Sequence, residues 1–348
     1  MAKQQIYSDF NYLEFEVWQG PVLQVLYAPY NYTRNYDLEM KYWNPETIQL
    51  FFYKHWSTSI YIAFIYICLI HALQRYQRTR KDWNLRLPLC LWNAALSIFS
   101  FIATIRFGEE FYTILTTRPL VHSVCYSISP FQPAAVWAFA FAISKVVELG
   151  DTIFLLMRKK PLIFLHWYHH AVVLIYSWNS GKDFLNFSKF NFFFFFKLHF
   201  NYKSITIVQN GILIFLASLK FLCHTVIQQE IYDNIYTIEV TAPGRWFIMM
   251  NFSVHSIMYA YYSITAWGIR LPKLFSMCVT VLQTSQMIVG VLISIVVLKQ
   301  KLKNAVCQQS MDNLALGFAI YSSFAVLFIR YFYDSYMRPK KFLQKKIE

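Results

Sequence analysis

Charged residues are scarce in this chain: Asp, Glu, Lys and Arg make up 14% of its 348 residues, whereas 57% are hydrophobic and 20% aromatic. So low a charged fraction excludes an ordinary soluble domain and is typical of a membrane protein. The apolar core of a cleavable signal peptide is also missing, because Lys3, Asp9, Glu14 and Glu16 keep the N-terminus polar. We therefore expect the first apolar segment to act as the targeting signal.

Seven apolar segments are long enough to cross a bilayer, which takes about 20 residues in a helix. They lie at 56–76, 88–107, 134–157, 161–178, 246–269, 274–298 and 311–333. A spanning segment must satisfy its own backbone hydrogen bonds, so all seven are expected to be α-helices. The sequence predicts an all-α, polytopic membrane protein: a single domain, residues 1–348, with seven transmembrane helices.

The net charge of +14 comes from basic residues that gather in alternate loops, and it indicates no nucleic-acid partner. They follow the first, third, fifth and seventh segments, and they include Arg75, Arg78, Arg80, Lys81, Arg86, Arg158, Lys159, Lys160, Arg270, Lys273, Arg338, Lys340, Lys341, Lys345 and Lys346. Basic loops mark the cytosolic side of a membrane protein. The pattern therefore places the C-terminus in the cytosol and the N-terminus on the opposite side.

One segment, about 184–240, departs from this pattern. Nine Phe fall between Phe184 and Phe200, and the rest is rich in Ile, Asn, Lys and Tyr. We interpret it from this composition as an atypical insert in a lumenal loop. It must cross the membrane zero times or twice, because a single crossing would invert every later helix.

Two smaller signals concern the compartment. Cys125 and Cys307 both fall in loops placed on the non-cytosolic side, where disulfides form, so we predict that they pair, with two free thiols as the alternative. The chain ends in Lys345-Lys346-Ile347-Glu348, which resembles a dilysine retrieval signal. It predicts residence in the endoplasmic reticulum membrane, and a solvated basic tail is the alternative interpretation.

Polar side chains recur at helical spacing within four of the apolar segments. His166, His169 and His170 are spaced i, i+3, i+4 and so share one helix face. The other groups are Lys145, Glu148 and Thr152 with Asp151 beside them; Asn251, His255, Tyr259 and Tyr262; and Gln283, Gln286 and Gly290. At 1.5 Å per residue, they lie roughly 10–20 Å from the cytosolic helix ends. They predict a buried reaction chamber entered from the cytosol.

Ionisable residues inside a bilayer are costly, so this cluster indicates a functional site. Any one group could instead pack in the helix bundle or form hydrogen bonds between helices. Metal is disfavoured, because membrane di-iron enzymes need several histidine boxes and this chain has one. A buried neutral imidazole can serve as a nucleophile or a base. Asn251, Tyr262 and Gln283 could then stabilise a developing enolate.

Four motifs carry a family resemblance. They are Lys-x-x-Glu-x-x-Asp-Thr at 145–152, His-x-x-His-His at 166–170, His-x-x-Met-Tyr-x-Tyr-Tyr at 255–262 and Thr-x-x-Gln-x-x-Gln at 280–286. In these motifs and their order the chain resembles the ELO family, the membrane fatty acid elongases. The resemblance covers about 40–183 and 241–340 and leaves out the insert.

The resemblance implies that an acyl-CoA condenses with malonyl-CoA to a 3-oxoacyl-CoA two carbons longer, with release of CO2 and CoA. By analogy, His169 takes the acyl group, His255 lies close to the thioester, and His166 and His170 orient the box with Asp151. The substrate-binding candidates are Lys145, Glu148, Asp151, Thr152, Asn251, Tyr259, Tyr262, Gln283 and Gln286, and Arg158, Lys159 and Lys160 are further candidates for CoA contacts. No bound cofactor is implied. The expected partners are membrane lipid, the other elongation-cycle enzymes and a second copy of the chain.

The residues between the box histidines resemble the branch that elongates saturated and monounsaturated chains. Three alternatives stay open on the sequence. The insert could make this chain an inactive isoform of an elongase. The chain could also be a histidine-box lipid desaturase or hydroxylase, or a transporter with a polar core.

Overall fold

A computed structural model of the protein describes residues 16–19, 21, 24–28, 30–34, 36–180 and 242–338. The predicted insert and the dilysine end lie outside the described residues. The N-terminal part holds an antiparallel hairpin, β1 (Glu16–Gln19) and β2 (Gln24–Tyr27), and two helices, α2 (Asp37–Met40) and α3 (Pro45–His55). The sequence analysis did not predict this hairpin. Asn44 caps α3, because its side chain accepts a hydrogen bond from the Thr47 backbone N–H and Pro45 follows at the first position.

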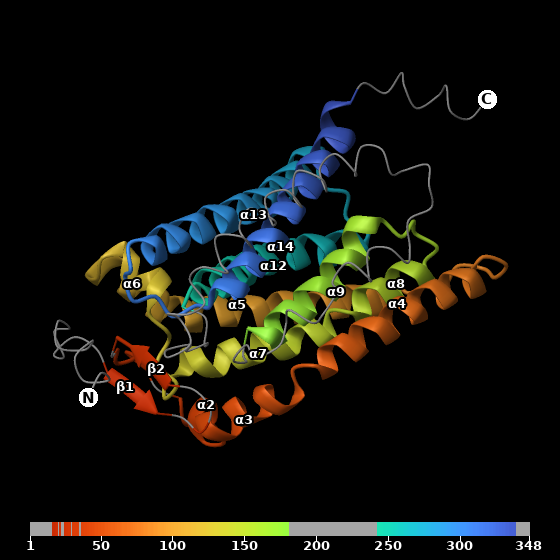
Figure 1. Ribbon diagram of the computed structural model, residues 1–348. Coiled ribbons are helices and arrows are strands. Elements are labelled where there is room, and N and C mark those ends of the chain that lie inside the picture. The colour runs from red at the N-terminus through yellow and green to blue at the C-terminus, as the bar shows by residue number, and fades with distance from the viewer. Residues whose placement is uncertain are drawn as a thin grey trace.

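The long helices run lengthwise and side by side, with the hairpin at one end and the C-terminus at the other (Figure 1). They are α4 (Thr58–Gln77), α5 (Arg86–Thr117), α7 (Pro133–Val147), α8 (Gly150–Met157), α9 (Phe164–Asn179), α12 (Gly244–Trp267), α13 (Lys273–Leu302) and α14 (Met311–Phe332). A short α6 (Leu120–Cys125) follows α5, and a π-helical turn, η3 (Tyr333–Met337), extends α14. The predominantly helical character expected from the sequence is thereby confirmed.

Four of the described helices are long and apolar enough to cross a membrane: α4, α5, α13 and α14. Helices α7 and α9 have 15 and 16 residues, and α12 is long enough but carries many polar side chains. These shorter or more polar helices are the ones that hold most of the motif residues. The count of seven spans therefore stays a prediction.

Two elements differ from the expected segments for identifiable reasons. The third segment is broken, because the chain turns at Glu148 and Leu149 between α7 and α8. Helix α5 continues to Thr117, well past the expected end at 107. Two charged residues of this helix are paired with other parts of the chain: Arg106 with Glu39, and Glu110 with Arg245 of α12.

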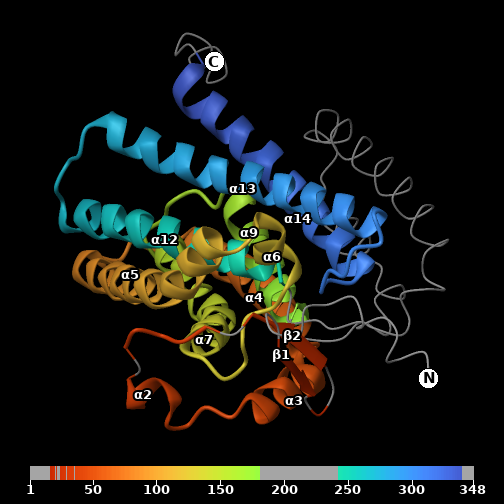
Figure 2. The same cartoon turned by 90° about the vertical axis from the view of Figure 1, so that its left-hand side faces the viewer.

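The helices pack in an order that brings distant segments together. Helix α12 lies along α5, α13 along α14, and α9 between α4, α7 and α14 (Figure 2). One apolar core fills the space between α9, α12, α13 and α14, and a second fills the space between α3, α4, α7 and α9. On the face of α9 that carries the histidines, His166 and His170 lie beside α8 and His169 lies beside α14.

The end of the bundle beside the hairpin is held by covalent and ionic links. Cys125 and Cys307 form a disulfide, the pair proposed from the sequence, which joins the end of α6 to the loop between α13 and α14. Arg245 donates to Glu110 at 2.8 Å and also to the backbone carbonyls of Ser123, Tyr126 and Ser127. Both side chains of the ion pair are almost completely buried.

Candidate active site

The three histidines on α9 have different surroundings. His166 Nε2 lies 3.1 Å from Thr152 Oγ1, and that hydroxyl is in turn 2.6 Å from the hydroxyl of Tyr66 on α4. His170 Nε2 lies 4.0 Å from Asp151 Oδ2. The rings of His166 and His170 are 4.6 Å apart, so these two histidines form one layer that α8 holds in place.

His169 is the exception among the three. Its Nδ1 is buried and has no hydrogen-bond partner among the described residues. Its ring packs at 4.9 Å from Phe324 of α14, and it lines a cavity. A buried polar atom without a hydrogen-bond partner is energetically costly. A substrate bound in the cavity would supply that partner.

Asp151 is held by two donors from other helices. Trp92 Nε1 of α5 donates to its Oδ1 at 2.6 Å, and the Tyr259 hydroxyl of α12 donates to its Oδ2 at 2.7 Å. The indole of Trp92 packs directly over Gly150, where a Cβ atom would lie 2.7 Å from the ring. Gly150 therefore leaves the space that the indole needs to reach the neighbouring carboxylate.

A second buried network joins α7 to α12. Lys145 Nζ donates to Glu148 Oε1 at 2.6 Å and to Asn251 Oδ1 at 2.8 Å. Asn251 Nδ2 lies 3.2 Å from His255 Nε2, and His255 Nδ1 lies 3.6 Å from Glu148 Oε1. The turn at Glu148 directs its carboxylate toward both Lys145 and His255. Since Lys145 is buried in this network, its contacts here are to protein rather than to a CoA phosphate.

The remaining predicted site residues divide between the cavity and the basic end of the bundle. Gln286 lines the cavity together with Asn251. Gln283 donates to the sulfur of Met258 at 3.1 Å. Tyr262 is 41% exposed and does not line the cavity. Arg158, Lys159 and Lys160 lie at the end of α8, at the opposite end of the bundle from the hairpin.

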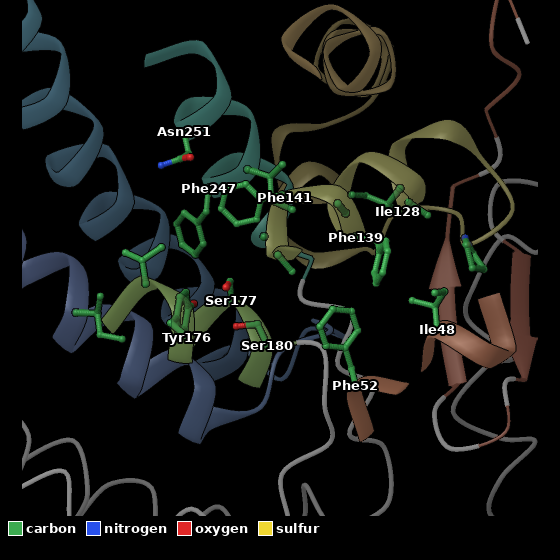
Figure 3. Close-up of a pocket in the computed structure, with 18 of the residues that line it drawn as sticks. Ile48, Phe52, Ile128, Phe139, Phe141, Tyr176, Ser177, Ser180, Phe247 and Asn251 are labelled. Carbon is green, nitrogen blue, oxygen red and sulfur yellow. The ribbon is translucent and has the colours of Figure 1, made fainter. Parts of the chain in front are cut away.

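A mostly apolar cavity begins at the histidine box and runs toward the hairpin. Near the box its walls are His169, Asn251, Gln286 and Phe324, and along α9 it continues past Tyr176 to Ser180. The eleven residue steps from His169 to Ser180, the C-cap of α9, rise about 16 Å. Figure 3 shows Asn251, Phe247 and Tyr176 gathered at one side of it, with Phe139, Phe52 and Ile48 at the other. Its shape and lining suit a long apolar chain attached to a polar reacting group.

The described residues contain no group of three or more His, Cys, Asp and Glu placed to hold a metal ion. His166, His170 and His255 instead lie beside hydroxyl, carboxylate and amide groups of the protein. The arrangement can support nucleophilic or acid–base chemistry at the mouth of an apolar cavity.

Trp92 and Tyr66 are the site residues that sequence reasoning missed. Each is a single aromatic residue within an apolar helix, and nothing in the local pattern distinguishes it from a packing residue. Only the structure shows that their polar atoms reach Asp151 and Thr152.

Comparison with known proteins agrees with these motifs. The family model described as ELO: GNS1/SUR4 family matches residues 51–202 and 216–344. A Caenorhabditis elegans protein named "Putative fatty acid elongase 4" is 38% identical over 97% of this chain and 96% of its own length. The Homo sapiens "Very long chain fatty acid elongase 3" is 33% identical over 90% and 92% of the two chains. The Drosophila melanogaster "Very long chain fatty acid elongase 6" is 34% identical over 89% and 81%.

Proposed function

Since this chain belongs to the ELO (GNS1/SUR4) family, we propose that it is a 3-oxoacyl-CoA synthase that carries out the condensation step of fatty acid elongation. It joins a long-chain acyl-CoA to malonyl-CoA and releases CO2 and CoA. The observation that carries the proposal is the position of His169, whose buried Nδ1 has no hydrogen-bond partner within the described part of the chain and whose ring lines an apolar cavity.

In the first half-reaction an imidazole nitrogen of His169 attacks the thioester carbonyl. The carbon–sulfur bond breaks, CoA leaves as the thiol, and the acyl group is carried as an acyl-imidazole. The acyl tail lies in the apolar cavity throughout. His166 and His170, fixed by Thr152 and Asp151, keep the box in the required orientation.

In the second half-reaction malonyl-CoA loses CO2, and the resulting enolate carbon attacks the acyl carbonyl. The carbon–nitrogen bond breaks, and the released imidazole nitrogen takes up a proton from solvent, which returns His169 to its starting form and leaves the 3-oxoacyl-CoA. Asn251 and Gln286 are the amides that line the cavity, so they are suited to stabilise the enolate oxygen. Lys145, Glu148 and His255 hold Asn251 in place.

Several finer assignments belong to the same proposal. We assign the substrate to the saturated or monounsaturated class, on the residues between the box histidines. The basic loops and the dilysine end support an endoplasmic reticulum membrane protein with a cytosolic C-terminus. Because a 3-oxoacyl-CoA must be reduced and dehydrated before the next round, we expect this chain to associate with enzymes of those classes.

Membranes that contain the protein, incubated with labelled malonyl-CoA and saturated acyl-CoAs, test the proposal. The expected product is a labelled 3-oxoacyl-CoA two carbons longer than the acyl-CoA supplied. A chain present at normal levels that gives no such product would contradict the proposed activity, unless deletion of 184–240 restores it. Restored activity would instead show that the insert makes this chain an inactive isoform.

A further inference from the structure

The far end of the cavity is built by the N-terminal cap, which we define as the described residues between Glu16 and His55. The cavity is lined by Trp18 of β1, by Trp43, which precedes α3, and by Ile48 of α3. Ile48 lies at the side away from Asn251 (Figure 3). Figure 3 shows Ile48 and Phe52 on this side, facing Phe139 of α7. A chain bound at the histidine box and long enough to reach this side of the cavity would therefore meet the cap.

The cap is fastened to the bundle by charged and polar contacts. The Glu39 carboxylate accepts hydrogen bonds from Nε and Nη2 of Arg106, at 2.9 and 2.6 Å. It also accepts one from Trp137 Nε1, at 2.9 Å. Burial works to raise the pKa of Glu39, but the hydrogen bonds from Arg106 and Trp137 hold it below its ordinary value. A bidentate, charge-assisted pair of this kind fixes geometry as well as supplying energy.

Trp43 is held in a defined position at this end. Its Nε1 donates to the carbonyl of Pro130 at 2.7 Å, and its ring packs at 6.1 Å from Phe139. Phe139 also meets Phe52 edge-on at 5.9 Å. These rings are restrained on several sides, so they form a firm boundary rather than one that a longer chain could easily push aside.

The cap residues Trp18, Trp43 and Ile48 precede residue 51, where the family match begins. The reacting end of the cavity therefore lies within the family match, whereas part of its far end lies before it. We propose that the N-terminal cap sets the acyl-chain length this protein accepts, with Trp43 as the principal stop. This inference rests on the proposed condensation activity, and it assigns the length limit to residues outside the motifs.

Rates of condensation with a ladder of saturated acyl-CoAs, each two carbons longer than the last, test the inference. Trp43→Ala opens space at the far end, so longer acyl chains should fit. The kcat/KM for the acyl-CoA two carbons longer than the wild-type optimum, divided by the kcat/KM for that optimum, should rise about tenfold. Ile48→Phe fills the same space, so the preferred chain should become at least two carbons shorter. The matched controls are Tyr42→Ala and Leu38→Phe, because those side chains are 82% and 84% exposed.

The outcomes separate the two proposals. Opposite shifts in Trp43→Ala and Ile48→Phe, with unchanged profiles in both controls, support the inference. Active variants that keep the wild-type length profile would overturn it while leaving the proposed function intact. If Trp43→Ala fails to fold, the direction of the Ile48→Phe shift decides. If the wild-type protein gives no condensation product at any length, the proposed function fails, and the inference with it.

Discussion

At the scale of single residues, the three histidines of α9 differ in whether a polar group of the described residues lies beside them. His166 and His170 are tied to Thr152 and Asp151, whereas His169 presents a buried nitrogen to the cavity. Three imidazoles at i, i+3, i+4 look equivalent in the sequence, because helical spacing shows only that they share a face. Neighbouring helices decide their roles, and these cannot be read from a local pattern.

His169→Ala should abolish condensation, with a loss of at least about a thousandfold in kcat, because no other described group is placed to carry the acyl chain. Expression and thermal stability should stay near those of the wild type, since Nδ1 of this side chain has no hydrogen-bond partner among the described residues to lose. Labelled malonyl-CoA incorporation measures the effect. Activity within tenfold of the wild type would remove His169 from the role of nucleophile.

Trp92→Phe should lower kcat about tenfold and leave KM for the acyl-CoA nearly unchanged. The change keeps an aromatic ring but removes the N–H that Asp151 accepts, and an unmade hydrogen bond to a buried carboxylate costs ~1–3 kcal/mol. Trp83→Phe is the control, because Trp83 is 54% exposed. Equal effects of both changes, or a rise in KM alone, would argue that Trp92 only packs.

At the scale of helices, apolar length and periodicity located the segments well but placed some boundaries wrongly. The break between α7 and α8 could not be predicted, because Glu148 there depends on Lys145 and His255, the latter on a helix about a hundred residues away. The expected end of α5 at 107 was too early, because the helix continues to Thr117 and Glu110 within that extension pairs with Arg245 of α12.

Helix α13 lies against α14 at Gly290, where a Cβ atom would overlap the ring of Tyr321, which lines the cavity. Gly290→Ala should therefore destabilise the protein by ~1–3 kcal/mol, even though Ala favours helix formation. Thermal unfolding in detergent measures the change, and exposed Ser285→Ala on the same helix is the control. A higher unfolding temperature for Gly290→Ala would show that helix propensity outweighs the clash.

At the scale of the whole molecule, the cavity is made by segments that lie far apart in the chain. Its reacting end comes from α9, α12, α13 and α14, and its far end from β1, α3 and α7. The motifs predicted the reacting end, since their polar residues stand out in apolar helices. The far end is mostly apolar and aromatic, with Gln49 of α3 among its lining residues, so nothing in the sequence separates it from ordinary core.

The disulfide ties the two halves of the described chain together across 182 residues. The double variant Cys125→Ser/Cys307→Ser should lower the free energy of unfolding by ~2–4 kcal/mol. Alkylation of the wild-type protein should label both cysteines only after reduction, as mass spectrometry can show. Cys68→Ser, at an exposed free cysteine, is the control. Alkylation of Cys125 before reduction would show that the pair is not oxidised.

Metal removal separates the proposed chemistry from the desaturase alternative. In the proposed reaction an imidazole carries the acyl group and no metal ion takes part. Treatment with a strong chelator should therefore leave the rate of condensation unchanged. Purified protein should likewise contain no stoichiometric iron. Loss of activity on chelation, with recovery on adding iron back, would favour a histidine-box oxygenase instead.

The most direct measurement is the state of His169 after the protein meets an acyl-CoA without malonyl-CoA. The account predicts a burst of about one CoA released per active site, as expected when a covalent acyl-enzyme accumulates. Mass spectrometry should locate one added acyl group on the α9 segment, and His169→Ala should show neither the burst nor the added mass. Condensation that proceeds without any burst, or an acyl group that persists in His169→Ala, would contradict the account.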